Sequence, residues 1–165
     1  MQLLTKYHNS PLGVLKIQAT PETITSIHFT EEIIGDSETS DLLELCARQL
    51  DEYFSGSRKT FDFPMEQKGT PFQISVWSHL LKVPYGKTLS YLSFSKGIGD
   101  VKAIRAVASA NGKNNLSIVV PCHRIIGSGA TMVGYSGGIW RKKWLLEHEA
   151  KTEHGIMQSS LFANS

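Results

Sequence analysis

Three strand-like runs occupy the first thirty positions of the chain, and apolar and polar residues alternate most clearly from Leu15 to Thr20. An alternation with a period of two residues is typical of half-buried β-strands. Turn-forming prolines separate the runs, at Asn9-Ser10-Pro11 and at Thr20-Pro21-Glu22. The pattern predicts strands over residues 3–7, 12–19 and 24–29.

The spacing of apolar residues changes to that of a helix between Leu42 and Tyr53. Ser40 or Asp41 is suited to begin this helix, and Gly56 is suited to end it. The first part of the chain therefore predicts a small sheet with one helix.

Residues 55–69 are rich in Ser, Gly, Pro and charge, and predict a domain boundary. Thr70 and Gln73 after them form a predicted capping box, with proline at the first helical position. The helix that follows is expected to bury Phe72, Val76, Trp77, Leu80 and Leu81.

Two short helices are predicted next, from Ser90 to Lys96 with Gly97 as the stop, and from Val101 to about Ala110. A short helix, a turn containing glycine and a second helix are the layout of a helix-turn-helix. In the second helix the expected buried stripe is Val101, Ile104, Val107 and Ala108, and the opposite face carries Lys102, Arg105, Ala106 and Ser109. Small residues beside two cations suit close approach to a phosphate backbone, although a merely solvated face has the same composition.

The run from Ser117 to Ile126 carries the most distinctive chemistry. Its β-branched residues Ile118–Val120 predict a short buried strand, which Pro121 must end because proline has no N–H to donate. The thiol of Cys122 would then be held at a strand end, beside an imidazole and a guanidinium.

Glycines cluster beyond the cysteine, at 127–129 and 134–138, and predict a loop. A last amphipathic helix is expected from Trp140 to about Glu149, and a polar, mobile tail from Thr152. The apolar face of this helix is predicted to contain Trp140, Trp144, Leu145 and His148.

Composition indicates an ordinary globular chain of 165 residues, with 41% hydrophobic and 19% charged residues. The sequence shows neither an apolar run of membrane-spanning length nor a signal-peptide pattern, so we expect a cytoplasmic protein, or a nuclear one in a eukaryote. Two cysteines in such a compartment are expected to be free thiols, with Cys46 a buried apolar residue of its helix.

Charge is divided along the chain. Residues 1–70 contain six Lys/Arg and eleven Asp/Glu, whereas residues 71–165 contain eleven Lys/Arg and four Asp/Glu. A basic second half suggests a polyanionic partner.

Cys122 needs a lowered pKa to act as a nucleophile, and a neighbouring imidazole is a common means. His123 is adjacent in sequence and points to the other side of an extended chain, so a bridging water or a local turn would be needed. Glu149 is an acid that could orient this histidine, and the same three groups would also suit a thiol hydrolase. The six scattered histidines show no paired zinc-type spacing, so no metal is expected.

Three segments together resemble one known family: Ile-Val-Val-Pro-Cys-His-Arg, Gly-Tyr-Ser-Gly-Gly and Lys-Trp-Leu-Leu-Glu-His-Glu. They are similar, in order and spacing, to the O6-alkylguanine-DNA alkyltransferases over residues 70–150. The resemblance implies an α/β (α+β) fold, with a ribonuclease-H-like sheet-and-helix domain over 1–69. A mostly helical, winged-helix-like DNA-binding and catalytic domain would span 70–151, before a polar tail at 152–165.

The family flips a damaged nucleotide out of duplex DNA and transfers the alkyl group from O6 of guanine to a cysteine. By resemblance, Cys122 is the acceptor, His123 the base acting through a water, and Glu149 the carboxylate that polarises His123. The product is a thioether, so one molecule repairs one lesion. The resemblance implies no cofactor and no metal, and a monomer whose partner is duplex DNA carrying O6-alkylguanine, or O4-methylthymine as a further substrate.

The remaining implied site residues surround the base and the DNA. Tyr91 would help to rotate the 3′ phosphate and donate to N3 of the base, and Arg105 would fill the gap in the stack. Asn114 would tie the helix-turn-helix to the active-site strand. The backbone carbonyls of Cys122 and Ile125 would accept from the guanine N2 amine. The base pocket would comprise Tyr135, Ser136, Asn114 and Ile125. The DNA-binding face would comprise Lys102, Arg105, Ala106, Ser109 and Tyr91.

Two features of the sequence bear on this resemblance. Asn114-Asn115 stands where the family often has Asn-Pro. Arg124 is expected to be structural, anchoring the end of the predicted strand by a salt bridge or carbonyl contacts. Two alternatives remain, an inert lesion-recognition protein, whose branch replaces the acceptor cysteine, and a winged-helix regulator, which gives no reason for Pro-Cys-His-Arg.

Overall fold

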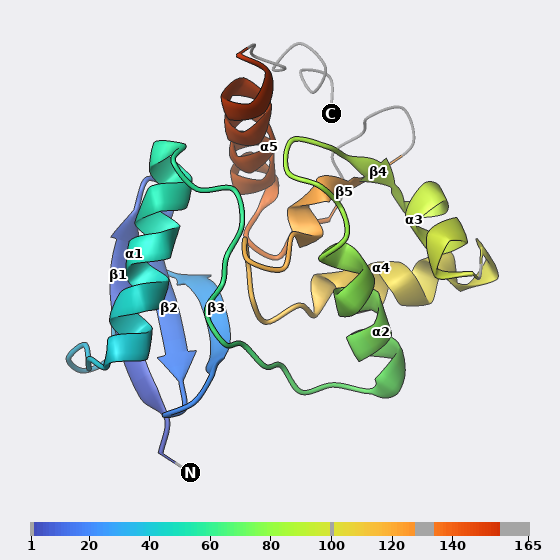
Figure 1. Ribbon diagram of the computed structural model, residues 1–165. Coiled ribbons are helices and arrows are strands. Elements are labelled where there is room, and N and C mark those ends of the chain that lie inside the picture. The colour runs from blue at the N-terminus through green and yellow to red at the C-terminus, as the bar shows by residue number, and fades with distance from the viewer. Residues whose placement is uncertain (1, 100, 128–133, 156–165) are drawn as a thin grey trace. The chain divides into compact units, whose positions relative to one another are not determined.

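The computed structural model describes residues 2–99, 101–127 and 134–155. The chain packs into two compact units (Figure 1). The first contains Met1–Lys68 and Asn115–Val119, and the second contains Gly69–Asn114 and Val120–Ser165. No helix in the described ranges combines the length and apolar character needed to cross a membrane.

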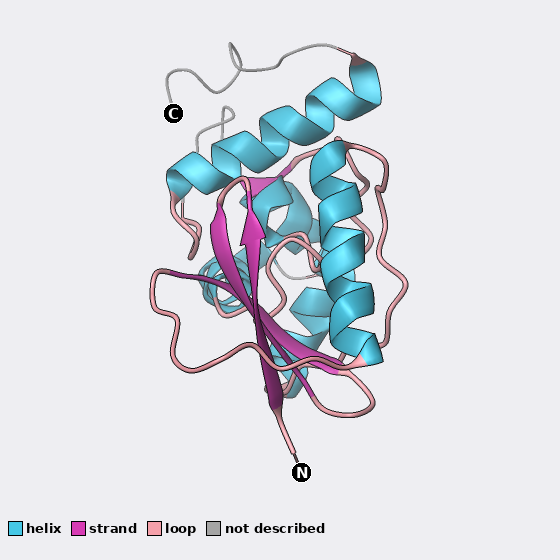
Figure 2. Cartoon of the chain, turned by 90° about the vertical axis from the view of Figure 1, so that its left-hand side faces the viewer, coloured by secondary structure: helices cyan, strands magenta, loops and turns pink. Residues whose placement is uncertain are grey.

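The first unit is built on an antiparallel sheet of β1 (Leu4–Ser10), β2 (Gly13–Ala19) and β3 (Ile24–Thr30), in the order β1-β2-β3 (Figure 2). β1 runs further than predicted, because Ser10 pairs with Gly13 and only two residues form the turn. Gly13 has φ 112°, which favours glycine at this turn. The alternation along β2 buries Leu15, Ile17 and Ala19.

Helix α1 (Asp41–Ser55) covers one face of this sheet. The Ser40 side chain accepts a hydrogen bond from the Leu43 N–H, and Gly56 ends the helix with φ 87°, so both predicted helix ends are confirmed. Its buried face contains Leu43, Cys46, Ala47, Gln49, Leu50 and Tyr53.

The second unit is mostly helical, which confirms the predicted mixed α/β fold. Helix α4 (Ile104–Gly112) packs against α2 (Pro71–Leu80) and α3 (Tyr91–Ile98) (Figure 1). The Trp77 Nε1–H donates to the Ala110 carbonyl at 2.9 Å. The predicted capping box of Thr70 and Gln73 is present. The elements are α2 (Pro71–Leu80), β4 (Leu89–Ser90), α3 (Tyr91–Ile98), η1 (Val101–Ala103), α4 (Ile104–Gly112), η2 (Cys122–Arg124), β5 (Ile125–Ile126) and α5 (Ile139–His154).

The predictions were wrong for several residues near the helix ends. Phe72 and Leu81 are exposed, because they lie at the two ends of α2. α3 continues to Ile98 and ends at Gly99, with φ 104°. Val101 is exposed because a 3₁₀ turn precedes α4, whose buried residues are Val107, Ala110 and Asn111.

The predicted apolar face of the last helix was right for Leu145, which is buried, and wrong for Trp140, while Trp144 and His148 are half-buried. Trp140 is 57% exposed, whereas the fully buried positions of α5 include a lysine and a glutamate. The helix also continues past Thr152, whose hydroxyl donates to the His148 carbonyl at 2.8 Å. Its buried residues are Lys142, Leu145, Leu146, Glu149 and Ala150.

The segment before the cysteine is buried, but the predicted strand over Ile118–Val120 was wrong. A single bridge joins Leu116 to Ile27, and two tight turns follow, with hydrogen bonds from Val119 N to Ser117 O and from Cys122 N to Val120 O, both 2.8 Å. Ile118 has φ 74°, a strained value for a β-branched residue. Local turns satisfy these backbone groups, so burial of the run requires no strand.

Candidate active site

Cys122 begins the 3₁₀ turn η2, which runs into β5. β5 pairs in parallel with β4, immediately before Tyr91 in the chain. A 3₁₀ turn has three residues per revolution, so the side chains of Cys122, His123 and Arg124 leave it in three directions. The thiol side chain is 4% exposed, and the cysteine is free.

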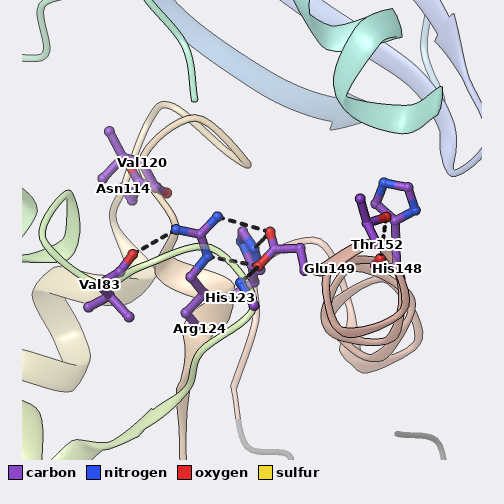
Figure 3. A network of polar contacts seen from close by, with 9 residues as sticks. Val83, Asn114, Val120, His123, Arg124, His148, Glu149 and Thr152 are labelled. Atoms are coloured by element: carbon purple, nitrogen blue, oxygen red, sulfur yellow. Dashed lines mark hydrogen bonds and ion pairs between the residues drawn. The ribbon is translucent and has the colours of Figure 1, made fainter. Parts of the chain in front are cut away.

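His123 and Arg124 converge on one carboxylate of α5 (Figure 3). His123 Nε2 lies 2.7 Å from Glu149 Oε2, and Arg124 Nε and Nη2 donate to the two Glu149 oxygens at 2.8 and 3.1 Å. Arg124 Nη1 also donates to the Val83 carbonyl at 2.7 Å, so both contacts expected of this residue are confirmed. All three charged or titratable side chains are buried.

The charges of this network define its protonation. Burial raises the pKa of Glu149, but the neighbouring His123 and Arg124 outweigh it and hold that pKa below its usual value. Burial lowers the pKa of His123 below its ordinary value, with Glu149 opposing, which favours the neutral imidazole at neutral pH. An ionised carboxylate only accepts hydrogen bonds, so Nε2 carries the proton and Nδ1 has a lone pair. Nδ1 is buried and has no hydrogen-bond partner among the described residues.

The surroundings of Cys122 act on its thiol in opposite directions. Burial raises the pKa of Cys122, whereas a hydrogen bond from Asn114 and the positive charge of Lys142 lower it. The Asn114 amide also donates to the Val120 carbonyl at 2.8 Å, so it holds the turn that precedes the thiol. Burial has the larger effect, so the pKa of Cys122 remains above its ordinary value, and the two polar groups reduce the cost of forming the thiolate within the buried site.

Lys142 extends from α5 with a fully buried side chain, and its Nζ donates to the Ile125 carbonyl at 2.6 Å. Burial lowers the pKa of Lys142 to about 8, although Cys122 opposes this shift. Sequence reasoning missed this residue. Its spacing to Leu145, Leu146 and Glu149 was the available signal, because those positions share one helical face.

A pocket of 520 Å³ in the second unit gathers four of the predicted residues, Tyr91, Arg105, Tyr135 and Ser136. Ile104, Ala108, Gly112 and Gly134 complete its described lining, which does not include Cys122, Asn114 or Ile125. Asn111 connects the two groups, because its Nδ2 donates to the Tyr91 hydroxyl at 3.1 Å and to the Cys122 carbonyl at 3.3 Å. Residues 128–133 of the predicted glycine-rich loop lie outside the described residues.

The predicted DNA-binding face of η1 and α4 is exposed. Lys102, Arg105, Ala106 and Ser109 are all exposed, as the sequence pattern indicated. Within the described ranges, no group of three or more His, Cys, Asp or Glu residues is arranged to hold a metal ion.

Two family models match the chain. The ribonuclease-like domain of 6-O-methylguanine DNA methyltransferase matches residues 3–67, and the DNA binding domain of the same family matches residues 71–151. The chain belongs to the 6-O-methylguanine DNA methyltransferase family. The resemblance based on the Cys122 motif is therefore confirmed.

Curated relatives and solved structures agree with this family. A constitutive methylated-DNA–protein-cysteine methyltransferase of Bacillus subtilis is 44% identical over 78% of this chain and 83% of its own length. One from Methanosarcina acetivorans is 38% identical over 85% and 94%. The crystal structure of Mycobacterium tuberculosis O6-methylguanine methyltransferase superposes with a TM-score of 0.83, at 36% identity over 92% and 94%. A structure of the M. tuberculosis protein in complex with DNA has the same TM-score, at 37% identity over 90% and 93%.

Proposed function

We propose that this methyltransferase-family chain is a DNA repair protein that transfers the alkyl group from O6 of guanine in duplex DNA to Sγ of its own Cys122. The observation that carries the proposal is a buried thiol in the same 3₁₀ turn as a neutral histidine whose Nε2–H pairs with Glu149. The names of the relatives, methylated-DNA–protein-cysteine methyltransferases, describe the same reaction. O4-methylthymine, which presents an alkoxy group on a pyrimidine, is a second substrate.

The proton of the Cys122 thiol moves through a bridging water to the lone pair of His123 Nδ1. Glu149 stabilises the imidazolium that forms, because its negative charge lies 2.7 Å from Nε2. The thiolate attacks the alkyl carbon, so an S–C bond forms as the O6–C bond breaks. The electron pair of the broken bond remains on guanine, which takes up a proton in place of the alkyl group.

Charge that develops on the leaving guanine is stabilised by donors around the base. Tyr91 donates to N3, and the Ser136 backbone N–H acts near O6 in the loop that Tyr135 closes. The carbonyls of Cys122 and Ile125 accept from the N2 amine. Asn114 supports this arrangement through its hydrogen bond to the Val120 carbonyl.

The exposed face of η1 and α4 binds the DNA. Lys102 contacts phosphates, and the small side chains of Ala106 and Ser109 allow the backbone to approach them closely. Extrusion of a nucleotide costs roughly a few kcal/mol, which Arg105 offsets by occupying the gap in the stack. Tyr91 and Arg105 both line the 520 Å³ pocket.

The thioether product is a poor leaving group, so each molecule acts once. The protein acts as a monomer and needs no cofactor or metal. Its substrate places it with the chromosome, in the cytoplasm of a prokaryotic cell or the nucleus of a eukaryotic one.

The test is to incubate the protein with duplex DNA containing O6-methylguanine and to measure its intact mass. We expect a gain of about 14 Da, located on Cys122 by peptide analysis, and no gain in Cys122→Ser. Cys46→Ser is the matched control and should gain the same mass as the wild type. Lesion-selective binding without any gain in mass would contradict the enzymatic function and favour a recognition protein.

A further inference from the structure

Asn111 is a buried asparagine that the mechanism above does not use. It occupies the last turn of α4, with 3% of its surface exposed. Its amide nitrogen lies 3.1 Å from the Tyr91 hydroxyl and 3.3 Å from the Cys122 carbonyl oxygen. One side chain therefore touches the tyrosine of the pocket and the backbone of the acceptor cysteine.

These two contacts determine the direction of the hydrogen bond to Tyr91. A carbonyl oxygen can only accept, so the Asn111 atom facing Cys122 must be the NH₂ group and not the oxygen. An amide nitrogen cannot accept, so it donates to the Tyr91 hydroxyl as well. The Tyr91 oxygen thus acts as the acceptor in this contact, and its own hydrogen must point elsewhere.

The Tyr91 hydroxyl hydrogen is therefore available to a ligand, because Tyr91 lines the 520 Å³ pocket. A tyrosine hydroxyl can either donate to a ligand or accept from it, and a neighbouring side chain often decides which. If position 111 presented an acceptor, the hydroxyl would donate to that side chain and would offer the pocket only lone pairs.

We propose that Asn111 is a positioning residue that commits Tyr91 to donate its hydroxyl hydrogen to the base in the pocket. This inference rests on the proposed alkyl transfer, in which Tyr91 donates to N3 of guanine. The Cys122 carbonyl has a supporting part, because it fixes which end of the amide faces Tyr91. The asparagine acts through Tyr91 and does not touch the reacting atoms.

The experiment measures single-turnover methyl transfer from duplex DNA carrying either O6-methylguanine or O6-methyl-3-deazaguanine. The deaza base has C–H in place of N3 and so cannot accept from Tyr91. We expect Asn111→Leu to be about 10-fold slower than the wild type on O6-methylguanine, because without the Asn111 donor the Tyr91 hydroxyl is free to rotate and its hydrogen bond to N3 weakens in the transition state. On the deaza base, the two proteins should agree within about 2-fold.

Two further variants make the test specific. Asn111→Asp has the same shape but presents acceptors, so it should lose at least as much rate as Asn111→Leu on O6-methylguanine, and it serves if the leucine variant fails to fold. Tyr91→Phe should remove the effect, so that Tyr91→Phe with Asn111→Leu is no slower than Tyr91→Phe alone. Asn115→Leu is the matched control, because the Asn115 side chain pairs with His28, and it should react as the wild type does on both bases.

The outcomes separate this inference from the proposed function. Absence of methyl transfer in the wild type would overturn the proposed function itself. Transfer in the wild type, with Asn111→Leu equally slowed on both bases or slowed on neither, would overturn the role of Asn111 alone. An Asn111→Asp variant as fast as the wild type on O6-methylguanine would also overturn it.

Discussion

The two cysteines of this chain are both buried, yet their surroundings differ. Cys46 lies on the apolar face of α1, and burial raises its pKa to about 12. Burial also raises the pKa of Cys122, but the Asn114 hydrogen bond and the Lys142 charge oppose it there. Burial by itself therefore makes an inert thiol, and a reactive one needs polar groups within the same buried volume.

The second difference is the network next to Cys122. His123 provides a lone pair in the same turn, and Glu149 with Arg124 keeps the other ring nitrogen protonated. Removing parts of this network one at a time should bring Cys122 progressively closer to the behaviour of Cys46.

The largest expected effect is that of Glu149→Gln, which keeps the shape of the side chain and removes the shared negative charge. Methyl transfer should slow about 100-fold, because the imidazolium loses its stabilising partner. The free energy of unfolding should fall by about 3 kcal/mol, because Arg124 remains charged and buried. Single-turnover kinetics and urea denaturation measure the two effects, and Glu147→Gln on the same helix is the matched control.

Stability against pH gives an independent check of the same variant. The pKa of Glu149 in the folded protein is below the ordinary value of 4.5, so the unfolded chain binds this proton more tightly. The stabilisation is present above that ordinary value and is lost as the pH falls toward the lower folded pKa. The free energies of unfolding of the wild type and Glu149→Gln should therefore converge as the pH falls. A constant difference between them at all pH values would contradict a lowered pKa of Glu149.

Lys142→Met should have an intermediate effect. Loss of the cation should raise the pKa of Cys122 and slow its labelling by iodoacetamide about 10-fold at neutral pH, the effect of one pKa unit. Cys46 in the same molecule serves as an internal reference whose labelling should not change. Lys143→Met is the matched control, and equal labelling of Cys122 in both variants would contradict an electrostatic role for Lys142.

Lys142 also predicts a change in stability at alkaline pH. Its folded pKa of about 8 lies below the ordinary 10.5, so between these values the unfolded chain binds more protons. Wild-type stability should rise with pH across this window relative to Lys142→Met.

Cys46→Ala should have the smallest effect. Methyl transfer should be unchanged, and the free energy of unfolding should fall by about 1 kcal/mol, because a small cavity opens beneath α1. A measured loss of methyl transfer in Cys46→Ala would contradict the inference that Cys46 has no part in the reaction.

Local patterns predicted helix ends where a capping residue marks them. Ser40 and Gly56 marked both ends of α1, and the Thr70–Gln73 capping box marked the start of α2. The face of α5 was misjudged because Lys142 and Glu149 are charged, and a pattern of apolar residues places such side chains in solvent. Ile118–Val120 were misjudged because β-branched residues can also fill a buried turn.

For the site, Pro-Cys-His-Arg and its companion segments were sufficient to name the family and the candidate acceptor. Adjacency of Cys122 and His123 gave no information about Asn111 or Lys142, which approach from α4 and α5. Both residues contact backbone carbonyls of the 122–125 segment, and nothing in the sequence identifies such a partner, although the spacing of Lys142 along α5 places it on the buried face.

The sequence by itself determined both ends of α1, the start of α2, the basic second half and the family to which Cys122 and its motif belong. These features depend on neighbouring residues or on residue types in order. The tertiary structure decided the pKa values and the hydrogen-bond directions. It lowers the pKa of both His123 and Glu149, and it makes Asn111 the donor to the Tyr91 hydroxyl. A pKa or a hydrogen-bond direction depends on burial and on charges from distant segments, and only folding brings Glu149 to His123, 26 residues away in the chain.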